Sequence, residues 1–189
     1  FNGKYYQAFY AGFPFRTVSA GMRVYYISDV EGDLALMQEI EGDVPAATPV
    51  IIECASANVA DNRIEPLLTT TAQVTDNLLC GVYFCNGKRP QESVDAYTKF
   101  DAGTMRILTV ADGKLVLSDN APERLQEIMV NDYTIYEQVP AICVPANTCY
   151  FKADANTPQQ VFLTSDPTAI GSLPSEKADV EQRCGVYSL

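Results

Sequence analysis

The chain contains no histidine among its 189 residues. This absence removes Ser-His-Asp and Cys-His nucleophile pairs, histidine-ligated zinc and the commonest general base. Serine–lysine chemistry survives, but the turn residues Lys88 and Lys114 have no serine partner at a recognisable spacing. Carboxylate pairs such as Glu39 with Glu41 also survive, although an acidic surface produces such pairs by chance. The sequence therefore predicts no catalytic residues and no enzymatic activity.

Motifs for metals and cofactors are missing as well. The glycines stand alone, as in turns, and none forms a phosphate-binding loop. No two cysteines have the C-x-x-C spacing of zinc knuckles and thioredoxins. Calcium would need a loop of alternating Asp and Asn, and the best candidate, residues 29–33, lacks the full spacing. We expect no cofactor and no metal site.

Long apolar runs and excess positive charge are also absent. No run approaches the roughly 20 apolar residues of a membrane helix, so we expect no membrane span. The net charge is −11 and the isoelectric point about 4.3. Such a surface repels phosphate backbones and argues against nucleic-acid binding, and solubility is its simplest explanation. The partner that we expect is instead an unidentified protein or a glycan.

Tryptophan is absent, which weakens a carbohydrate-stacking site without excluding it, whereas the chain has 11 tyrosines. The densest aromatic cluster contains Tyr5, Tyr6, Phe9 and Tyr10. Its simplest interpretation is an alternating strand with one face in the core. The alternative is a binding surface, for which Tyr5, Tyr6 and Tyr10 are the candidate residues.

The six cysteines allow up to three disulfides in 15 connectivities. Several lie inside apolar runs, where a free cysteine acting as a small hydrophobic residue is as plausible as a disulfide. Cys143 and Cys149 flank a turn and form the candidate disulfide. Cys80 and Cys85 could approach one another only if the chain between them bends. We expect an extracytoplasmic protein with at most partial disulfide bonding.

Two motifs occur twice in the same order. Residues 44–48 and 144–148 share the pattern Val-Pro-Ala-x-Thr, and each precedes an apolar run that is typical of a strand. Residues 22–24 (M-R-V) and 105–107 (M-R-I) each lead through a glycine turn to a second apolar run. This pattern indicates one β unit used twice. Each copy alone would leave an apolar strand face exposed, so the two copies should share a core.

The predicted fold is therefore all-β, a β-sandwich or barrel-like assembly of two related halves. The halves cover about 5–80 and 81–165 and form one domain over 1–165. The second half contains an insertion, in which one short helix is expected near 122–130. The evidence for this helix is Asn120 as an N-cap, Pro122 in the first turn and an apolar face of Leu125, Ile128 and Met129.

The composition changes after residue 165. Residues 166–182 are polar, contain two prolines and are typical of a linker. Residues 183–189 become strand-like again, as if they began another, truncated segment. The chain opens without an initiator methionine, and we expect it to be part of a larger polypeptide.

One further set of residues is spread over both halves and consists of Phe13, Val24, Tyr25, Tyr26, Leu34, Leu36, both Val-Pro-Ala-x-Thr turns, Asn77, Leu78, Leu79, Gly81, Cys149 and Tyr150. Together these residues resemble a duplicated β module of secreted and surface proteins of gut and oral Bacteroidetes. The similarity covers residues 5–165, and the tail resembles the approach to a C-terminal sorting segment, cut off before its usual Asp or Asn, Gly and Arg. The resemblance implies a C-terminal module behind larger domains and assigns no catalytic residues. The family is not rich in cysteine, so the six cysteines are a departure.

The expected function is that of a non-catalytic accessory module of a secreted or cell-surface protein, serving as a spacer or in adhesion or ligand binding. The alternative is a carbohydrate-binding or carbohydrate-active module. An exposed tyrosine cluster beside a groove would favour the alternative, whereas buried tyrosines and featureless sheet faces would favour a spacer.

Overall fold

The structure is a computed structural model, which describes residues 3–83, 98–120, 123–130, 133–140 and 144–169. The predicted all-β class is confirmed, because the regular elements of these residues are strands and two short 3-10 turns. The strands are β1 (Tyr5–Phe9), β2 (Phe15–Thr17), β3 (Arg23–Glu31), β4 (Leu34–Glu39), β5 (Val50–Cys54), β6 (Ile64–Pro66), β7 (Leu79–Val82), β8 (Met105–Ala111), β9 (Lys114–Ser118), β10 (Glu123–Val130), β11 (Tyr133–Pro140), β12 (Thr148–Lys152) and β13 (Gln160–Thr164), and the 3-10 turns are η1 (Val59–Asp61) and η2 (Pro167–Ala169).

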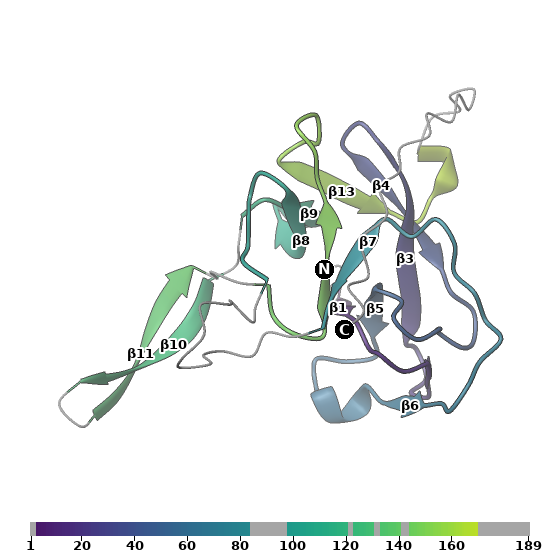
Figure 1. The fold of residues 1–189 in the computed structure, drawn as a ribbon, viewed down its shortest axis with the longest axis horizontal. Coiled ribbons are helices and arrows are strands. Elements are labelled where there is room, and N and C mark those ends of the chain that lie inside the picture. Colours follow the sequence, from purple (N-terminus) through teal and green to yellow (C-terminus); the bar gives the residue numbers. More distant parts are fainter. Residues whose placement is uncertain (1–2, 84–97, 121–122, 131–132, 141–143, 170–189) are drawn as a thin grey trace.

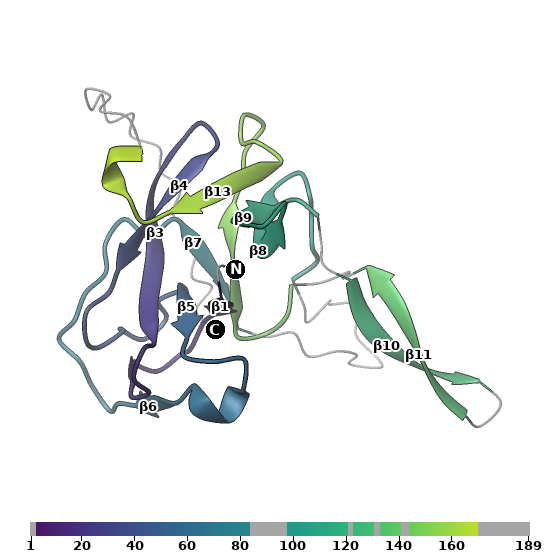
Figure 2. The ribbon, with the colours of Figure 1, turned by 180° about the vertical axis from the view of Figure 1, so that it is seen from behind.

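Nine strands form one sheet that curls into a nearly closed barrel (Figure 1). Their order is β1-β5-β3-β4-β13-β9-β8-β12-β7, so four strands from each half flank β13 in mirrored order. Strand β13 runs parallel to β4 and antiparallel to β9 (Figure 2), and it therefore joins the two halves. Strand β7 spans the expected boundary between the halves at residues 80 and 81, and it pairs with β12 in the second half.

The two Val-Pro-Ala-x-Thr turns have the same backbone conformation. Their fourth residues, Ala47 and Asn147, are left-handed, with φ of 55° and 57°. The amide of Ala47 donates to the carbonyl of Ala11 (2.9 Å), and the amide of Asn147 donates to that of Val82 (2.8 Å). These acceptors lie just beyond the end of β1 and at the end of β7, respectively. Each turn thus positions the next strand, β5 or β12, against the corresponding neighbour.

The second repeated motif aligns two residues away from its sequence match. Val24 on β3 pairs with Ile52, and Met105 on β8 pairs with Lys152. Ile52 and Lys152 occupy the same place relative to the two turns. Met105 therefore corresponds in the ladders to Val24, although the sequence match had placed it opposite Met22. A shift of two residues keeps side chains on the same face of a strand, because strand side chains alternate with a period of two.

Apolar cores cover both faces of the sheet around β5. Residues such as Ile27, Ile51 and Leu117, which come from strands around the barrel, fill its interior. A second core, which includes Phe15 and Val44, lies on the outer face. The small β2–β6 sheet contributes Phe15 to this core. Burial on both faces explains why β5 begins with three consecutive apolar residues, Val50 to Ile52, and each such buried side chain contributes about 1.5–3 kcal/mol.

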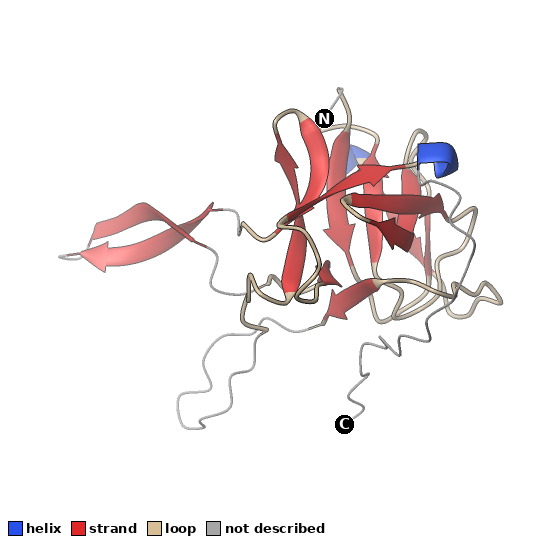
Figure 3. Cartoon of the chain, turned by 90° about the horizontal axis from the view of Figure 1, so that it is seen from above, coloured by secondary structure: helices blue, strands red, loops and turns tan. Residues whose placement is uncertain are grey.

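The predicted helix near 122–130 is wrong. Residues Glu123–Val130 form β10, which pairs antiparallel with β11 from Glu123 opposite Pro140 to Val130 opposite Tyr133. The helical pattern was short, and pairing with a partner strand rich in Tyr, Thr, Ile and Val overrides such weak local preferences. The β10–β11 hairpin is a separate two-stranded sheet that projects away from the barrel (Figure 3).

The C-terminal expectations fall mostly outside the described residues. Of the linker expected over 166–182, the structure describes only 166–169, where Pro167–Ala169 forms η2. The remainder of that linker and the segment expected over 183–189 lie outside the described part of the chain.

Candidate binding site

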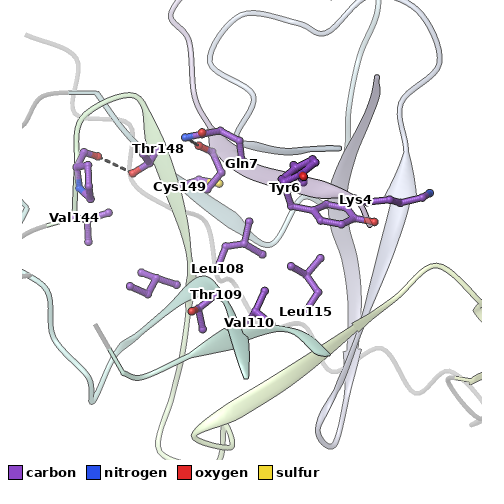
Figure 4. A pocket seen from close by; sticks show the side chains of 14 residues that line it. Lys4, Tyr6, Gln7, Leu108, Thr109, Val110, Leu115, Val144, Thr148 and Cys149 are labelled. Carbon is purple, nitrogen blue, oxygen red and sulfur yellow. Dashed lines mark hydrogen bonds between the residues drawn. The ribbon is translucent and has the colours of Figure 1, made fainter. Parts of the chain in front are cut away.

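A hollow of about 400 Å³ opens in the barrel wall between β1 and β8 (Figure 4). Its lining is mostly aliphatic, with two tyrosines and a few polar side chains at its edges. Its size is that of a small-ligand or peptide site. The lining residues are Lys4, Tyr5, Tyr6, Gln7, Ala8, Ile107, Leu108, Thr109, Val110, Leu115, Val144, Pro145, Thr148 and Cys149.

The hollow follows the edge of β1. The lining includes four consecutive residues from Tyr5 to Ala8, which alternate between the two faces of the sheet. A hollow over one face would touch only every second residue, so this one lies along the strand edge. Within the described residues, the only ladder of β1 is the one with β5.

The opposite wall is a second strand edge. Strand β8 pairs with β12 through Met105 and Arg106 alone, and its next four residues, Ile107 to Val110, line the hollow. The other edge of β8 pairs with β9 through a tight turn at Asp112 and Gly113, whose φ values of 50° and 69° match a type I′ hairpin. Two strand edges therefore face one another across the hollow.

Backbone groups point from both edges into the hollow. The amide of Tyr10 donates to Asn147 (2.9 Å), on the side away from β5. Backbone direction alternates along a strand, so the N–H and C=O of Ala8 point to this same side. The side-chain amide of Gln7 donates to the Ala8 carbonyl at 3.3 Å, which agrees with that direction. On β8, the residue next to the hairpin turn faces β9, so Leu108 and Val110 face the hollow.

The corresponding seam on the other side of the barrel is closed. There, the amide of Leu78 donates to the carbonyl of Ile27 on β3 at 2.9 Å. By the ladder registers, Ile27 of β3 corresponds to Leu108 of β8. The two halves thus differ at equivalent places, with a hydrogen-bonded seam in one and a hollow in the other.

One end of the hollow carries a charge cluster. Glu53 is buried, with 7% of its surface exposed. Its carboxylate accepts hydrogen bonds from Lys4 Nζ (2.7 Å) and from the Tyr6 hydroxyl (3.0 Å). Burial, followed by the hydrogen bond to Glu53, raises the pKa of Tyr6 to about 12. The phenol therefore stays a neutral donor at physiological pH, and Figure 4 shows Lys4 and Tyr6 together at this end.

The three candidate tyrosines separate into two places. Tyr5, which is 50% exposed, and Tyr6 line the hollow. Tyr10 lies elsewhere and packs edge-to-face against Tyr83, with ring centroids 5.7 Å apart. Its ring occupies the space where a side chain at position 81 would begin, so Gly81 is required there. Tyr5 and Tyr6 can reach a ligand in the hollow, and Tyr10 has a packing role.

The candidate disulfide between Cys143 and Cys149 is wrong. Cys149 is a free thiol on the core-facing side of β12, where its Sγ donates to the carbonyl of Val50 at 3.3 Å. Burial raises the pKa of this thiol to about 12, so it is unreactive. Cys143 lies outside the described residues. Cys54 is also a free thiol, whereas Cys80 is disulfide-bonded.

Sequence reasoning missed the aliphatic half of the site. Leu108, Val110 and Leu115 lie in alternating strands, and such residues are normally assigned to a core. Their position beside an open strand edge follows only from which strands pair. One signal was present in the sequence. Leu108, Val110 and Leu115 belong to the second copy of the repeat, whereas the tyrosine-rich strand belongs to the first.

The described residues contain no cluster of three or more Cys, Asp and Glu side chains that could hold a metal ion. No carboxylate is found among the residues that line the hollow. Within the described part of the chain, no helix is long and apolar enough to cross a membrane.

No family model, curated protein or solved structure matches the chain. The resemblance to modules of Bacteroidetes proteins therefore stays a prediction.

Proposed function

We propose that the chain is a non-catalytic binding module of a secreted or cell-surface protein, with its ligand in the hollow between β1 and β8. The observation that carries this proposal is the pair of facing strand edges with an aliphatic lining and the half-exposed Tyr5 at its rim. A module that served only as a spacer would have no reason to leave this seam open, because its counterpart at Leu78 and Ile27 is closed by a hydrogen bond.

Export is supported by the disulfide at Cys80, because disulfides form and persist mainly in oxidising compartments. Protease treatment of intact cells that produce the protein tests this part. Digestion of the protein without cell lysis is the expected result. Protection until lysis would contradict export to the surface.

A matched pair of substitutions tests the site. Val110 lies at the hollow and is 53% exposed, whereas Val59 is 84% exposed and lies in η1. Both positions should tolerate an aspartate, and circular dichroism checks that they do. With a panel of peptides, glycans and small apolar ligands, Val110→Asp should weaken binding about tenfold, since it places a charge in an apolar site. Val59→Asp should leave binding unchanged, and equal effects of the two would place the ligand elsewhere.

A carbohydrate-binding or carbohydrate-active module is the second candidate, because the exposed ring of Tyr5 could stack on a sugar face. The remaining lining favours it less, since glycan sites need several polar groups and hydrolysis needs a carboxylate pair. A glycan array combined with hydrolysis assays tests it. Binding that depends on Tyr5 and not on Val110 would favour this candidate, and turnover of any polysaccharide would overturn the non-catalytic assignment.

A further inference from the structure

We infer that the ligand is an extended peptide segment of a partner protein, which enters the hollow as an added strand between β1 and β8. The inference rests on the proposed function and names the chemistry of its ligand. Both walls of the hollow are strand edges, contributed by Tyr5 to Ala8 on one side and by Ile107 to Val110 on the other. An added strand would complete the barrel at the seam where the β1 and β8 ladders stop.

The backbone of the peptide would pair with specific groups. Ala8 on β1 and both Leu108 and Val110 on β8 direct their N–H and C=O groups toward the hollow. Strand addition satisfies such groups and is a common way for a sheet to bind a peptide. The Gln7 side chain, which now covers the Ala8 carbonyl at 3.3 Å, lies on the surface and can move aside.

The lining determines the side chains of the peptide. Leu108, Leu115 and Cys149 present an aliphatic surface toward the barrel interior. Alternate residues of an added strand point to opposite faces, so every second peptide residue should be apolar and the others polar. About four paired residues match the four that line each wall.

Charge determines what flanks the paired residues. The chain has a net charge of −11, with 24 acidic and 13 basic residues. An acidic protein attracts a cationic segment and repels an acidic one, which affects the association rate most strongly. Lys4, the one charged side chain that lines the hollow, is already paired with Glu53, so the net charge decides, and we assign lysine or arginine to both ends of the segment. A glycan carries no such charge and would leave the directed backbone groups only partly satisfied.

A synthetic peptide tests the inference directly. The probe is a blocked heptapeptide with lysine at both ends and three valines alternating with two threonines between them. Its controls are the same peptide with methylated central amides and a version with glutamate ends. Methylation should weaken binding about tenfold, because it removes backbone hydrogen bonds without removing side chains. Glutamate ends should slow association, more so at low salt.

Amide hydrogen exchange provides a readout that side-chain docking alone would not give. Peptide binding should slow exchange at Ala8, Leu108 and Val110, whose amides face the hollow. The amides of Gln7 and Phe9, which face β5, should change little. Equal binding of the methylated peptide, or no protection at these three positions, would overturn strand addition while leaving a binding site in the hollow.

The remaining outcomes separate the inference from the proposed function. If a glycan or small molecule binds in a Val110-dependent way and no peptide does, the peptide assignment is wrong and the binding module stands. If nothing in the panel binds, both fail. Tighter binding of a peptide with the sequence of residues 184–189 would assign the site to this chain itself. A dimer that Val110→Asp dissociates would assign the site to a second copy of the chain. Either result would overturn the assignment of the site to a partner protein.

Discussion

Among single residues, Glu53 is the centre of the clearest charge arrangement in the molecule. It is buried at one end of the hollow between the Lys4 ammonium and the Tyr6 hydroxyl. A buried carboxylate is costly unless hydrogen bonds and an opposite charge compensate it. Tyr6 therefore stabilises the Glu53 carboxylate only in its protonated form, because only the protonated hydroxyl can donate a hydrogen bond to it.

This arrangement predicts a loss of stability at alkaline pH. The pKa of Tyr6 in the folded protein, about 12, lies above its ordinary value of 10, so the folded state holds the phenol proton more tightly. The stabilisation is complete below pH 10 and is lost as the pH rises through 12. Tyr6→Phe should lower the free energy of unfolding at pH 8, and its difference from the native chain should shrink by pH 11.

Urea denaturation at the two pH values measures this difference. Tyr5→Phe is the control, because Tyr5 lies in the same hollow with half of its surface exposed, and its effect on the free energy of unfolding should be small. A Tyr6→Phe difference that does not change between pH 8 and pH 11 would show that the hydroxyl proton is not what stabilises the cluster.

Arg106 shows what the sequence cannot reveal about a residue. It belongs to the repeated Met-Arg motif, yet it is buried, with 4% of its surface exposed. Its guanidinium donates to the carbonyls of Ala102 (2.6 Å) and Pro158 (2.7 Å), and also to those of Met105 and Thr157. Arg23, its match in the first copy of the motif, is exposed and forms an ion pair with Glu39, so the motif alone carried no information about the role of Arg106.

Among the elements, we expect the β10–β11 hairpin to contribute little to the stability of the barrel. It forms its own sheet, and it occupies a place where the first half has only a short turn at Gly42 and Asp43. Replacing residues 123–140 with a short Gly-Ser link should change the melting temperature of the barrel by only a few degrees, since loop closure costs little. Thermal unfolding followed by circular dichroism measures the change.

Truncation before β13 is the matched comparison for that deletion. It removes fewer residues of regular structure from the described chain, but it leaves β4 and β9 without the strand that pairs with both. This variant should lose its cooperative transition. If excision of the hairpin were equally damaging, the hairpin would have to be part of the folding unit.

The sequence predicted those elements whose apolar pattern is decided locally. Strands β3, β5, β8 and β9 fall on the repeated motifs and the apolar runs that follow them, because those runs are bounded by Gly, Asp and Pro turns. Residues 123–130 were misassigned because Leu125, Ile128 and Met129 fit a short helix about as well as a strand. The candidate site was only half predicted, since the hollow depends on where the β1 and β8 ladders end, and register is a property of pairs of strands.

At the scale of the whole molecule, the halves have mirrored strand orders, and we expect them to depend on one another because β13 pairs with a strand of each. Fragments 1–72 and 73–169 are divided in the irregular segment between β6 and β7. Neither should unfold cooperatively alone, because β13 of the second fragment pairs with β4 of the first and the two fragments share one core. Mixed together, they should regain the far-ultraviolet dichroism and the melting transition of the intact chain. Val161→Asp in the second fragment, which puts a charge at a fully buried site, should prevent this recovery.

A fragment that folded on its own would contradict this dependence. It would mean that one copy of the β unit buries its apolar face without the other, and that the shared core is not required for stability. Nuclear magnetic resonance spectra of each isolated fragment distinguish the two cases, since dispersed amide signals appear only in a folded chain.

The parallel pairing of β13 with β4 also constrains when the protein can fold during its synthesis. Leu34 meets Phe162, its ladder partner, only after roughly 130 further residues have been synthesised. Contacts between such distant residues form late and slowly, because the intervening chain must first lose its freedom. The nascent chain would therefore leave the ribosome with β4 still unpaired along one edge, and β13 would later complete the pairing of β4. Under the export proposed above, this delay has a use, since a chain whose β4 still lacks its partner β13 remains unfolded enough to be translocated.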